Sequence, residues 1–354
     1  MNSSLRTPEE VLSALSKPDL LPVNNLTLEP DDWLILCAGF EERAIASIEQ
    51  SAANTAPFNV LLVHYEPAIA ANKVATIEEI CNGAGIKITH LTYDRQDPAG
   101  FGEPLLETLR SCRGRLFVDI SGMSRLLIVQ TLVALGTRRE GFAGCFVVYI
   151  EAENYPPSQK EAEAELNKSE SDPSFQIFFL SSGVSEVTLV PELASRTLVG
   201  LQNRLVAFPS LDAHQLIALR AELQPSRLTV IEGIPPDQHN QWREKVIALV
   251  NHLDEISQSD RYRVSTLRYG ETLDGLLEIY RKHSVHERLL ISPTGSKMQA
   301  VAVGILRAYL DDVQIVYPTP RDFLKPERYT SGVSKMHLLS LESFSNDRTH
   351  RFGI

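Results

Sequence analysis

A series of five short apolar segments occurs twice in this chain, and this repetition restricts the possible folds more than any other feature. The first series lies between Trp33 and Glu151 and reads WLILCAG, NVLLVHYE, ITHLTYD, RLFVDIS and CFVVYIE. The second lies between Arg204 and Pro318 and reads RLVAFPS, RLTVIEGIPP, YRVSTLRY, ERLLISP and VQIVYP. Segments of helical periodicity or length separate the runs, and strands that alternate with helices predict a parallel sheet covered on both faces.

Matching landmarks in the two series lie at nearly constant distances. Lys297 follows Arg125 by 172 positions, and Tyr317 follows Tyr149 by 168. The tetrapeptide SGVS also recurs, at 182–185 and 331–334, and its offset is only 149 because the excursion before it is shorter in the second copy. We therefore predict an α/β fold of two tandem Rossmann-like units with mainly parallel sheets, related by internal duplication and a pseudo-two-fold axis.

The same pattern predicts where each unit begins and ends. FQIFFLSSGVSEVTLVP is predicted to close the first unit as a hairpin, and MHLLSLE to close the second. The predicted division is a lead segment 1–30, a first unit 31–190, a connector 191–203, a second unit 204–345 and a tail 346–354.

Composition excludes several classes of function. The net charge of −11 argues against binding to duplex nucleic acid, which relies on a basic surface, so an anionic ligand needs a local site. No apolar run approaches the length of a membrane span, and the first residues lack the pattern of a signal peptide, so we expect a cytoplasmic protein with no membrane partner. The four cysteines have no metal-ligand spacing, and neither disulfides nor a metal site is predicted.

Two turns carry the residues best suited to bind a ligand. Each follows the fourth strand of its series and precedes a helix, at the carboxyl edge where open parallel sheets bind ligands. Glycine permits close backbone approach, serine or threonine caps the helix, and arginine or lysine adds a charge to the helix end, which suits phosphate or another anion. The alternative is that the serines are only caps and the cations are solvated. The candidate ligand-binding residues here are Ser121, Gly122, Met123, Ser124 and Arg125 in the first turn, and Pro293, Thr294, Gly295, Ser296 and Lys297 in the second.

The loops after the first strand of each series are predicted to face the same cleft. Gly39, Phe40, Arg43 and Ser210 are the candidate binding residues there. The sequence leaves open whether Arg43 pairs with Glu41 or Asp119, or reaches an anionic ligand. Asp119 ends an apolar strand, and its counterpart in the second series is Ile291, so any chemistry at Asp119 is confined to one unit.

The strand order and the turn PTGSKM, with SGMSR as a more distant version, resemble the CARF domains, Rossmann-like sensors associated with CRISPR systems. CARF domains carry a T-G-G-T-K-type turn after strand four, and the SAVED domain is similar to two such units in one chain. The resemblance covers about residues 31 to 345. It implies a pseudo-dimer that binds a cyclic oligonucleotide between its two units.

Three functions remain open. The first is a sensor that binds a nucleotide second messenger and signals to a separate effector protein in antiviral defence. The second is a ring-nuclease-like enzyme, a metal-independent phosphodiesterase that aligns a ribose 2′-hydroxyl for attack. The third is a non-enzymatic assembly subunit of a defence complex. No cofactor is expected, and no catalytic residue is assigned.

Overall fold

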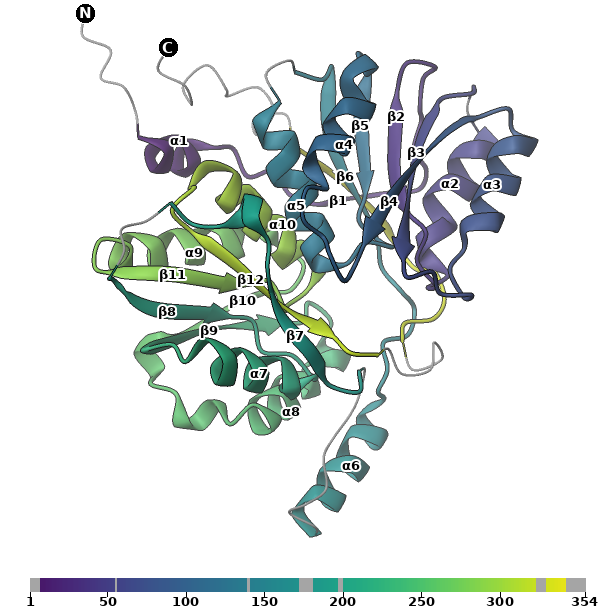
Figure 1. The fold of residues 1–354 in the computed structure, drawn as a ribbon. Helices are drawn as coiled ribbons and strands as arrows, with labels where there is room; N and C mark the ends of the chain where they lie inside the picture. Colours follow the sequence, from purple (N-terminus) through teal and green to yellow (C-terminus); the bar gives the residue numbers. More distant parts are fainter. Residues whose placement is uncertain are drawn as a thin grey trace, which may run out of the picture.

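In a computed structural model, the chain forms two mostly parallel β-sheets, one of seven strands and one of six (Figure 1). The structure describes residues 7–54, 56–138, 141–171, 181–196, 200–322 and 329–341. The helices are α1 (Pro8–Ala14), α2 (Arg43–Asn54), α3 (Val74–Gly83), α4 (Gly102–Thr108), α5 (Arg125–Thr137), α6 (Gln159–Ser171), α7 (Ala213–Leu223), α8 (Trp242–Val250), α9 (Tyr269–His283) and α10 (Lys297–Tyr309). The strands are β1 (Leu21–Val23), β2 (Trp33–Cys37), β3 (Asn59–Glu66), β4 (Lys87–Asp94), β5 (Arg115–Asp119), β6 (Gly144–Ile150), β7 (Val184–Leu189), β8 (Gln202–Ala207), β9 (Arg227–Ile234), β10 (Arg261–Ser265), β11 (Glu287–Ser292), β12 (Gln314–Pro320) and β13 (Met336–Ser340).

The two sheets repeat one topology. The first has the order β1-β13-β6-β5-β2-β3-β4 and the second β10-β9-β8-β11-β12-β7. In both, the third, second, first, fourth and fifth strands of the unit lie side by side and parallel, and an antiparallel strand follows the fifth. The predicted fold class, two Rossmann-like units related by duplication, is confirmed.

The closing strands, however, are exchanged between the units. β7 follows the first unit in the sequence but pairs with β12 of the second sheet, and β13 at the end of the second unit pairs with β6 of the first sheet. The prediction that 175–191 closes the first unit as a hairpin is therefore wrong for its described part, Ser181 onward; residues 175–180 lie outside the described residues. Consequently the sheets do not follow the predicted boundaries 31–190 and 204–345. A closing strand can pair antiparallel with any exposed edge strand that runs in the opposite direction. The residue pattern of the closing strand does not indicate which of the two sheets provides that edge strand.

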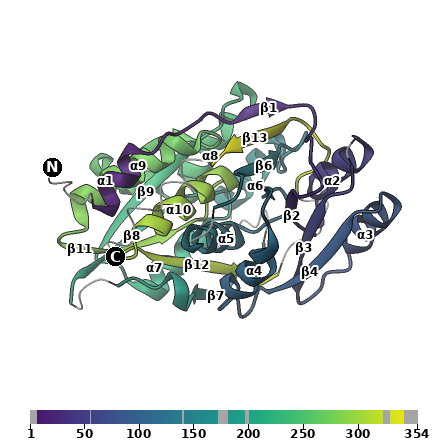
Figure 2. The ribbon, with the colours of Figure 1, turned by 90° about the horizontal axis from the view of Figure 1, so that it is seen from above.

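A single large core lies between the two sheets. It contains the buried faces of α4, α5, α9 and α10 and alternate residues of the strands; along β2, for example, Trp33, Ile35 and Cys37 face this core. Leu34 and Leu36 face a second core under α2 and α3, on the outer side of the first sheet. α5 is buried on nearly every side because it packs against α10 in the centre of the molecule, as Figure 2 shows from above.

The lead segment connects both units. α1 packs on α9 and α10, and Glu9 accepts a hydrogen bond from Arg281 at 2.6 Å, whereas β1 adds an antiparallel edge strand to β13 of the first sheet. Among the described helices, none has both the length and the apolar character that crossing a membrane requires.

Candidate functional site

The two turns singled out in the sequence meet where α5 and α10 begin. Each turn leaves the carboxyl end of a central strand, β5 or β11, and ends in a serine N-cap. The hydroxyl of Ser124 accepts the Leu127 N–H at 3.2 Å, and that of Ser296 accepts the Gln299 N–H at 3.1 Å. The capping role considered for both serines is therefore present, and it directs two helix N-termini toward the same region.

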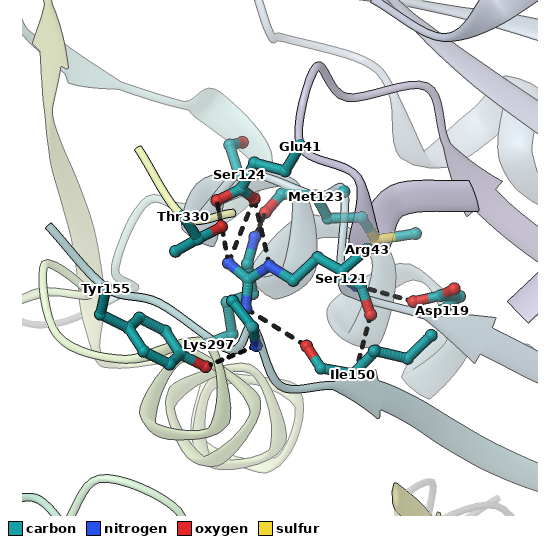
Figure 3. A network of polar contacts seen from close by, with 12 residues as sticks. Glu41, Arg43, Asp119, Ser121, Met123, Ser124, Ile150, Tyr155, Lys297 and Thr330 are labelled. Carbon is teal, nitrogen blue, oxygen red and sulfur yellow. Dashed lines mark hydrogen bonds and ion pairs between the residues drawn. The ribbon is translucent and has the colours of Figure 1, made fainter. Parts of the chain in front are cut away.

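The two cations cross between the units in a reciprocal arrangement. Nζ of Lys297 donates to the carbonyl oxygen of Met123, as Figure 3 shows. Nε of Arg125 donates to the carbonyl oxygen of Gly295. Met123 and Gly295 are themselves 172 positions apart, so the two contacts are equivalent under the duplication. The alternative that both cations are merely solvated is wrong, since each holds the turn of the other unit.

Burial changes the ionisation of the lysine. Burial lowers the pKa of Lys297 to about 7, and the positive charges of Arg43 and Arg125 act in the same direction, while Glu41 opposes them. An amine with this pKa is roughly half neutral at physiological pH.

The glycines of the two turns allow close packing against the protein itself. A Cβ on Gly122 would lie 2.1 Å from the carbonyl oxygen of Cys37 at the end of β2. A Cβ on Gly295 would lie 2.2 Å from Oε1 of Gln299 and 3.0 Å from Cβ of Phe208. Each turn thus lies directly on the chain that leaves the first strand of its own unit, and the described contacts at these glycines are with protein atoms.

Arg43 pairs with Glu41, one of the three alternatives that the sequence left open. Its Nη2 lies 3.1 Å from both carboxylate oxygens of Glu41, and its Nη1 donates to the carbonyl oxygen of Ile150 at 3.2 Å. Burial alone would raise the pKa of Glu41, but Arg43 and Lys297 lower it overall. The hydroxyl of Thr330 also donates to Glu41. The carboxylate is therefore ionised and neutralised from several sides.

The second unit repeats this arrangement with different residues. Asp212 lies 171 positions after Glu41, and the hydroxyl of Ser181 donates to it as that of Thr330 donates to Glu41. His214 stands where the first unit has Arg43. Burial raises the pKa of Asp212, with His214 and Arg125 opposing the rise. The two halves thus have the same plan, but a histidine stands in the second where the first has an arginine.

Asp119 organises the first turn. Its carboxylate accepts the Ser121 N–H at 2.7 Å and the Ser47 hydroxyl, and the Ser121 hydroxyl accepts the Ile150 N–H at 2.9 Å. Burial raises the pKa of Asp119. Ser121 and Asp119 are thus occupied with fixing the backbone between β5 and β6.

Several other predicted residues make contacts within the protein. The Thr294 hydroxyl donates to the carbonyl oxygen of Phe208 at 2.8 Å, and the Ser210 hydroxyl accepts the Asp212 N–H at 3.2 Å. Phe40 packs edge-to-face on Tyr329, with ring centroids 5.0 Å apart. Gly39 lies against Gly122, and Pro293 is buried. The contacts described for these residues are with other parts of the protein.

Three contributors were missed in the sequence. Tyr65 accepts the Ser124 N–H at 2.6 Å with its hydroxyl, which donates to the carbonyl oxygen of Gly122 at 3.3 Å. Thr330 and Ser181 directly precede the two SGVS repeats, so the repeated motif itself was the signal that marked them. No such signal marked Tyr65, because a strand tyrosine is as compatible with core packing as with a polar contact.

Comparison with known proteins identifies no family for this chain. No known family and no curated protein matches it. Among solved structures, one similar chain is the cytoplasmic domain of a prokaryotic cation chloride cotransporter, at 10% identity and a TM-score of 0.25 over 82% of this chain and 95% of that one. Another is a Haemonchus contortus phosphoethanolamine N-methyltransferase, at 8% identity and a TM-score of 0.22 over 90% and 89%. Within the described residues, no group of three or more histidine, cysteine or acidic side chains is placed to hold a metal ion.

Proposed function

We propose that this chain is a sensor that binds an anionic nucleotide between the turns 121–125 and 293–297 and signals to a separate effector. The observation that carries the proposal is the reciprocal contact of Arg125 and Lys297, which brings two cations and two helix N-termini to one point between the units. The cyclic oligonucleotide class, and a role in antiviral defence, rest on the resemblance to CARF and SAVED domains.

The reciprocal contacts also suggest how the ligand is held. Each cation donates to a neutral backbone carbonyl, and a phosphate oxygen is the stronger acceptor for a charged donor. A phosphate group that enters between the turns can therefore draw both side chains away from the carbonyls and shift Lys297 to its charged form. The loss of both contacts loosens the junction of the two units. The ligand can thereby change the conformation of the surface that binds an effector.

A further donor supports ligand binding at this end of α10. The Gln299 side chain is buried, its Oε1 accepts the Ser296 N–H at 2.8 Å, and its Nε2 has no hydrogen-bond partner among the described residues. A buried amide donor without an acceptor costs about 1–3 kcal/mol. A ligand oxygen next to the first turn of α10 would satisfy it.

Titration calorimetry with cyclic di-, tri- and tetra-adenylate at modest salt tests the proposal. Arg125→Ala and Lys297→Ala should each weaken binding by about 1.5–3 kcal/mol, the range for hydrogen bonds to charged groups, with Lys297 the more damaging because its turn is closer to the CARF pattern. Arg110→Ala removes an exposed cation outside the site and should leave the affinity unchanged.

Stability must be measured for the same variants. Both cations bridge the units, so each alanine should also lower the free energy of unfolding by about 1 kcal/mol. If the folded protein binds none of the three nucleotides, or if the variants bind as tightly as the unaltered protein, the sensor proposal fails and the assembly-subunit alternative is preferred.

The second candidate is cleavage of the bound nucleotide, and the pKa of about 7 at Lys297 favours it. The fraction of Lys297 that stays neutral when the phosphodiester binds can accept the proton of a ribose 2′-hydroxyl, a general-base role that needs no metal. The 2′-oxygen then attacks the phosphorus, and the bond from phosphorus to the 5′-oxygen breaks. Chromatography of the nucleotide recovered after calorimetry separates the two functions, because a sensor returns the intact ring and a phosphodiesterase returns linear product.

A further inference from the structure

The two closing strands, β7 and β13, differ in whether another strand pairs with their outer side. β13 has β6 on one side and β1 on the other, with Leu21 opposite Leu338, Pro22 opposite His337 and Val23 opposite Met336. β7 has β12 on one side, and among the described residues no strand pairs with its other side. Figure 2 shows β1 beside β13 and, at the opposite side of the molecule, β7 beyond β12.

The pairing register makes β7 and β13 equivalent residue by residue. His337 lies opposite Tyr149 in the first sheet, and Thr188 lies opposite Tyr317 in the second. Tyr149 and Tyr317 are equivalent landmarks of the duplication, and the offset between the two SGVS motifs gives the same match. The three residues of β13 that β1 covers, 336–338, therefore correspond to 187–189 of β7.

Each of the residues 187–189 of β7 is more exposed than its counterpart in β13, as expected if β7 lacks the neighbouring strand that β1 provides for β13. Met336 and His337 are buried, and Leu338 is partly buried beside Val23. Val187 and Thr188 are only partly buried, and Leu189 is 58% exposed. Ile217, on the helix α7 that packs beside β7, is 57% exposed. The second unit thus presents an apolar sheet edge at the place where the first unit is covered.

We propose that the outer edge of β7 is a docking site for an extended segment of a partner protein, which adds as an antiparallel strand in the way that β1 adds to β13. Strand addition satisfies the backbone groups of an open edge and places alternate side chains against the apolar residues. The partner segment carries an aliphatic residue opposite Leu189, as Leu21 lies opposite Leu338. This surface is independent of the ligand proposal.

Charge specifies the partner further. A partner segment that pairs with β7 as β1 pairs with β13 places its equivalent of Leu21 opposite Leu189. Its equivalent of Asn24, three residues later, then lies opposite Glu186, which is exposed. A lysine or arginine there forms a cross-strand ion pair. A second copy of this chain is a poorer occupant, because two molecules of net charge −11 repel one another and their β7 edges both carry Glu186.

A labelled peptide of residues 18–27, PDLLPVNNLT, is the probe, and fluorescence anisotropy with the full chain is the measurement. We expect saturable binding, and about two- to fivefold tighter binding for the peptide with Asn24→Lys, which is the effect of one cross-strand ion pair. Leu189→Asp in the protein should weaken binding more than tenfold, while Val285→Asp, a substitution at a 74% exposed residue outside the edge, should not.

Three results would overturn this proposal. One is the absence of saturable binding of either peptide up to about 1 mM. Another is hydrogen exchange at the β7 amides that is as slow as at the β13 amides in the chain alone, which would mean that the chain covers this edge itself. The last is a dimer in light scattering that Leu189→Asp dissociates, which would identify the occupant as a second copy.

Discussion

Lys297 is the residue at which the stability and the proposed function of this protein meet. It is the only lysine for which the structure indicates a strongly lowered pKa, among the described residues, and its ammonium group bridges the two units at Met123. A lysine whose folded pKa lies below its unfolded value favours the neutral form on folding. Between about pH 7 and its ordinary value of 10.5 the unfolded chain holds a proton that the folded chain lacks, so stability rises with pH in this window.

Lys297→Met therefore has a pH-dependent effect on stability. The difference in unfolding free energy between the unaltered protein and the variant should grow in favour of the unaltered protein from pH 7 to pH 9, by up to about 1.4 kcal/mol per pH unit. Urea denaturation of both proteins at pH 7, 8 and 9 measures it. Lys168→Met, at an exposed lysine of α6, serves as the control and should show no such trend. A constant difference across this range would show that Lys297 keeps an ordinary pKa.

At the scale of residues, the sequence predicted that the side chains of the two turns lie near one another. It did not predict which groups accept their hydrogen bonds. Arg125 and Lys297 were recognised from position and spacing, and each contacts the turn that carries the other. Their acceptors are backbone carbonyls of the opposite turn, and nothing in the sequence identifies a carbonyl as an acceptor. Glu41 was one of three possible partners for Arg43, and the choice depended on the path of the loop after β2.

At the scale of elements, partly buried ion pairs join the central strands near their starts, and their polarity is opposite in the two sheets. In the first sheet Arg115, which opens β5, pairs with Asp32 just before β2, at 3.1 Å between Nε and Oδ2. In the second sheet Glu287, which opens β11, pairs with Arg204 of β8, at 3.1 Å between Oε1 and Nη2. The fourth strand thus begins with a cation in one unit and an anion in the other. Pairing β2 with β11 would bring two carboxylates together, which favours the correct pairing of duplicated strands.

Arg204→Met should cost about 3 kcal/mol of unfolding free energy, because it leaves the carboxylates of Glu287 and Asp260 without their common partner. Adding Glu287→Met should recover part of this loss, since one of the two unpaired charges is then removed. Arg110→Met breaks an exposed pair with Glu107 and should cost less than about 0.5 kcal/mol. Chemical denaturation of the three variants and the unaltered protein gives the comparison. Equal stability of the Arg204→Met and Arg110→Met proteins would contradict it.

The elements themselves were largely predictable, and their assignment to sheets was not. The apolar runs of both series form strands in the expected order, because a buried parallel strand has a strong local pattern. β7 and β13 have no local feature that names their partner strand. Their exchange accompanies the packing of α5 on α10, a contact between the two units that lies outside both strands.

At the scale of the whole molecule, the two units share one core and are not separable bodies. The core between the sheets takes side chains from α4 and α5 of the first unit and from α9 and α10 of the second (Figures 1 and 2). α1 packs on the second unit before the chain enters the first sheet. The proposed ligand site lies at one end of the contact between α5 and α10, which is among the most extensive contacts between described elements.

The exchange of β7 and β13 makes the two halves interlocked. If residues 1–195 and 196–354 were translated as separate polypeptides, each would lack the strand that completes its own sheet and would carry the strand that its counterpart needs. We expect neither half to fold cooperatively when expressed alone, and the two to assemble into a stable heterodimer when expressed together, with an affinity tag on one half recovering the other. Deleting residues 184–189 from the first half should abolish this recovery. Two halves that each unfold cooperatively in isolation would instead describe a pair of independent domains, and the duplication could then have been divided between two genes without loss.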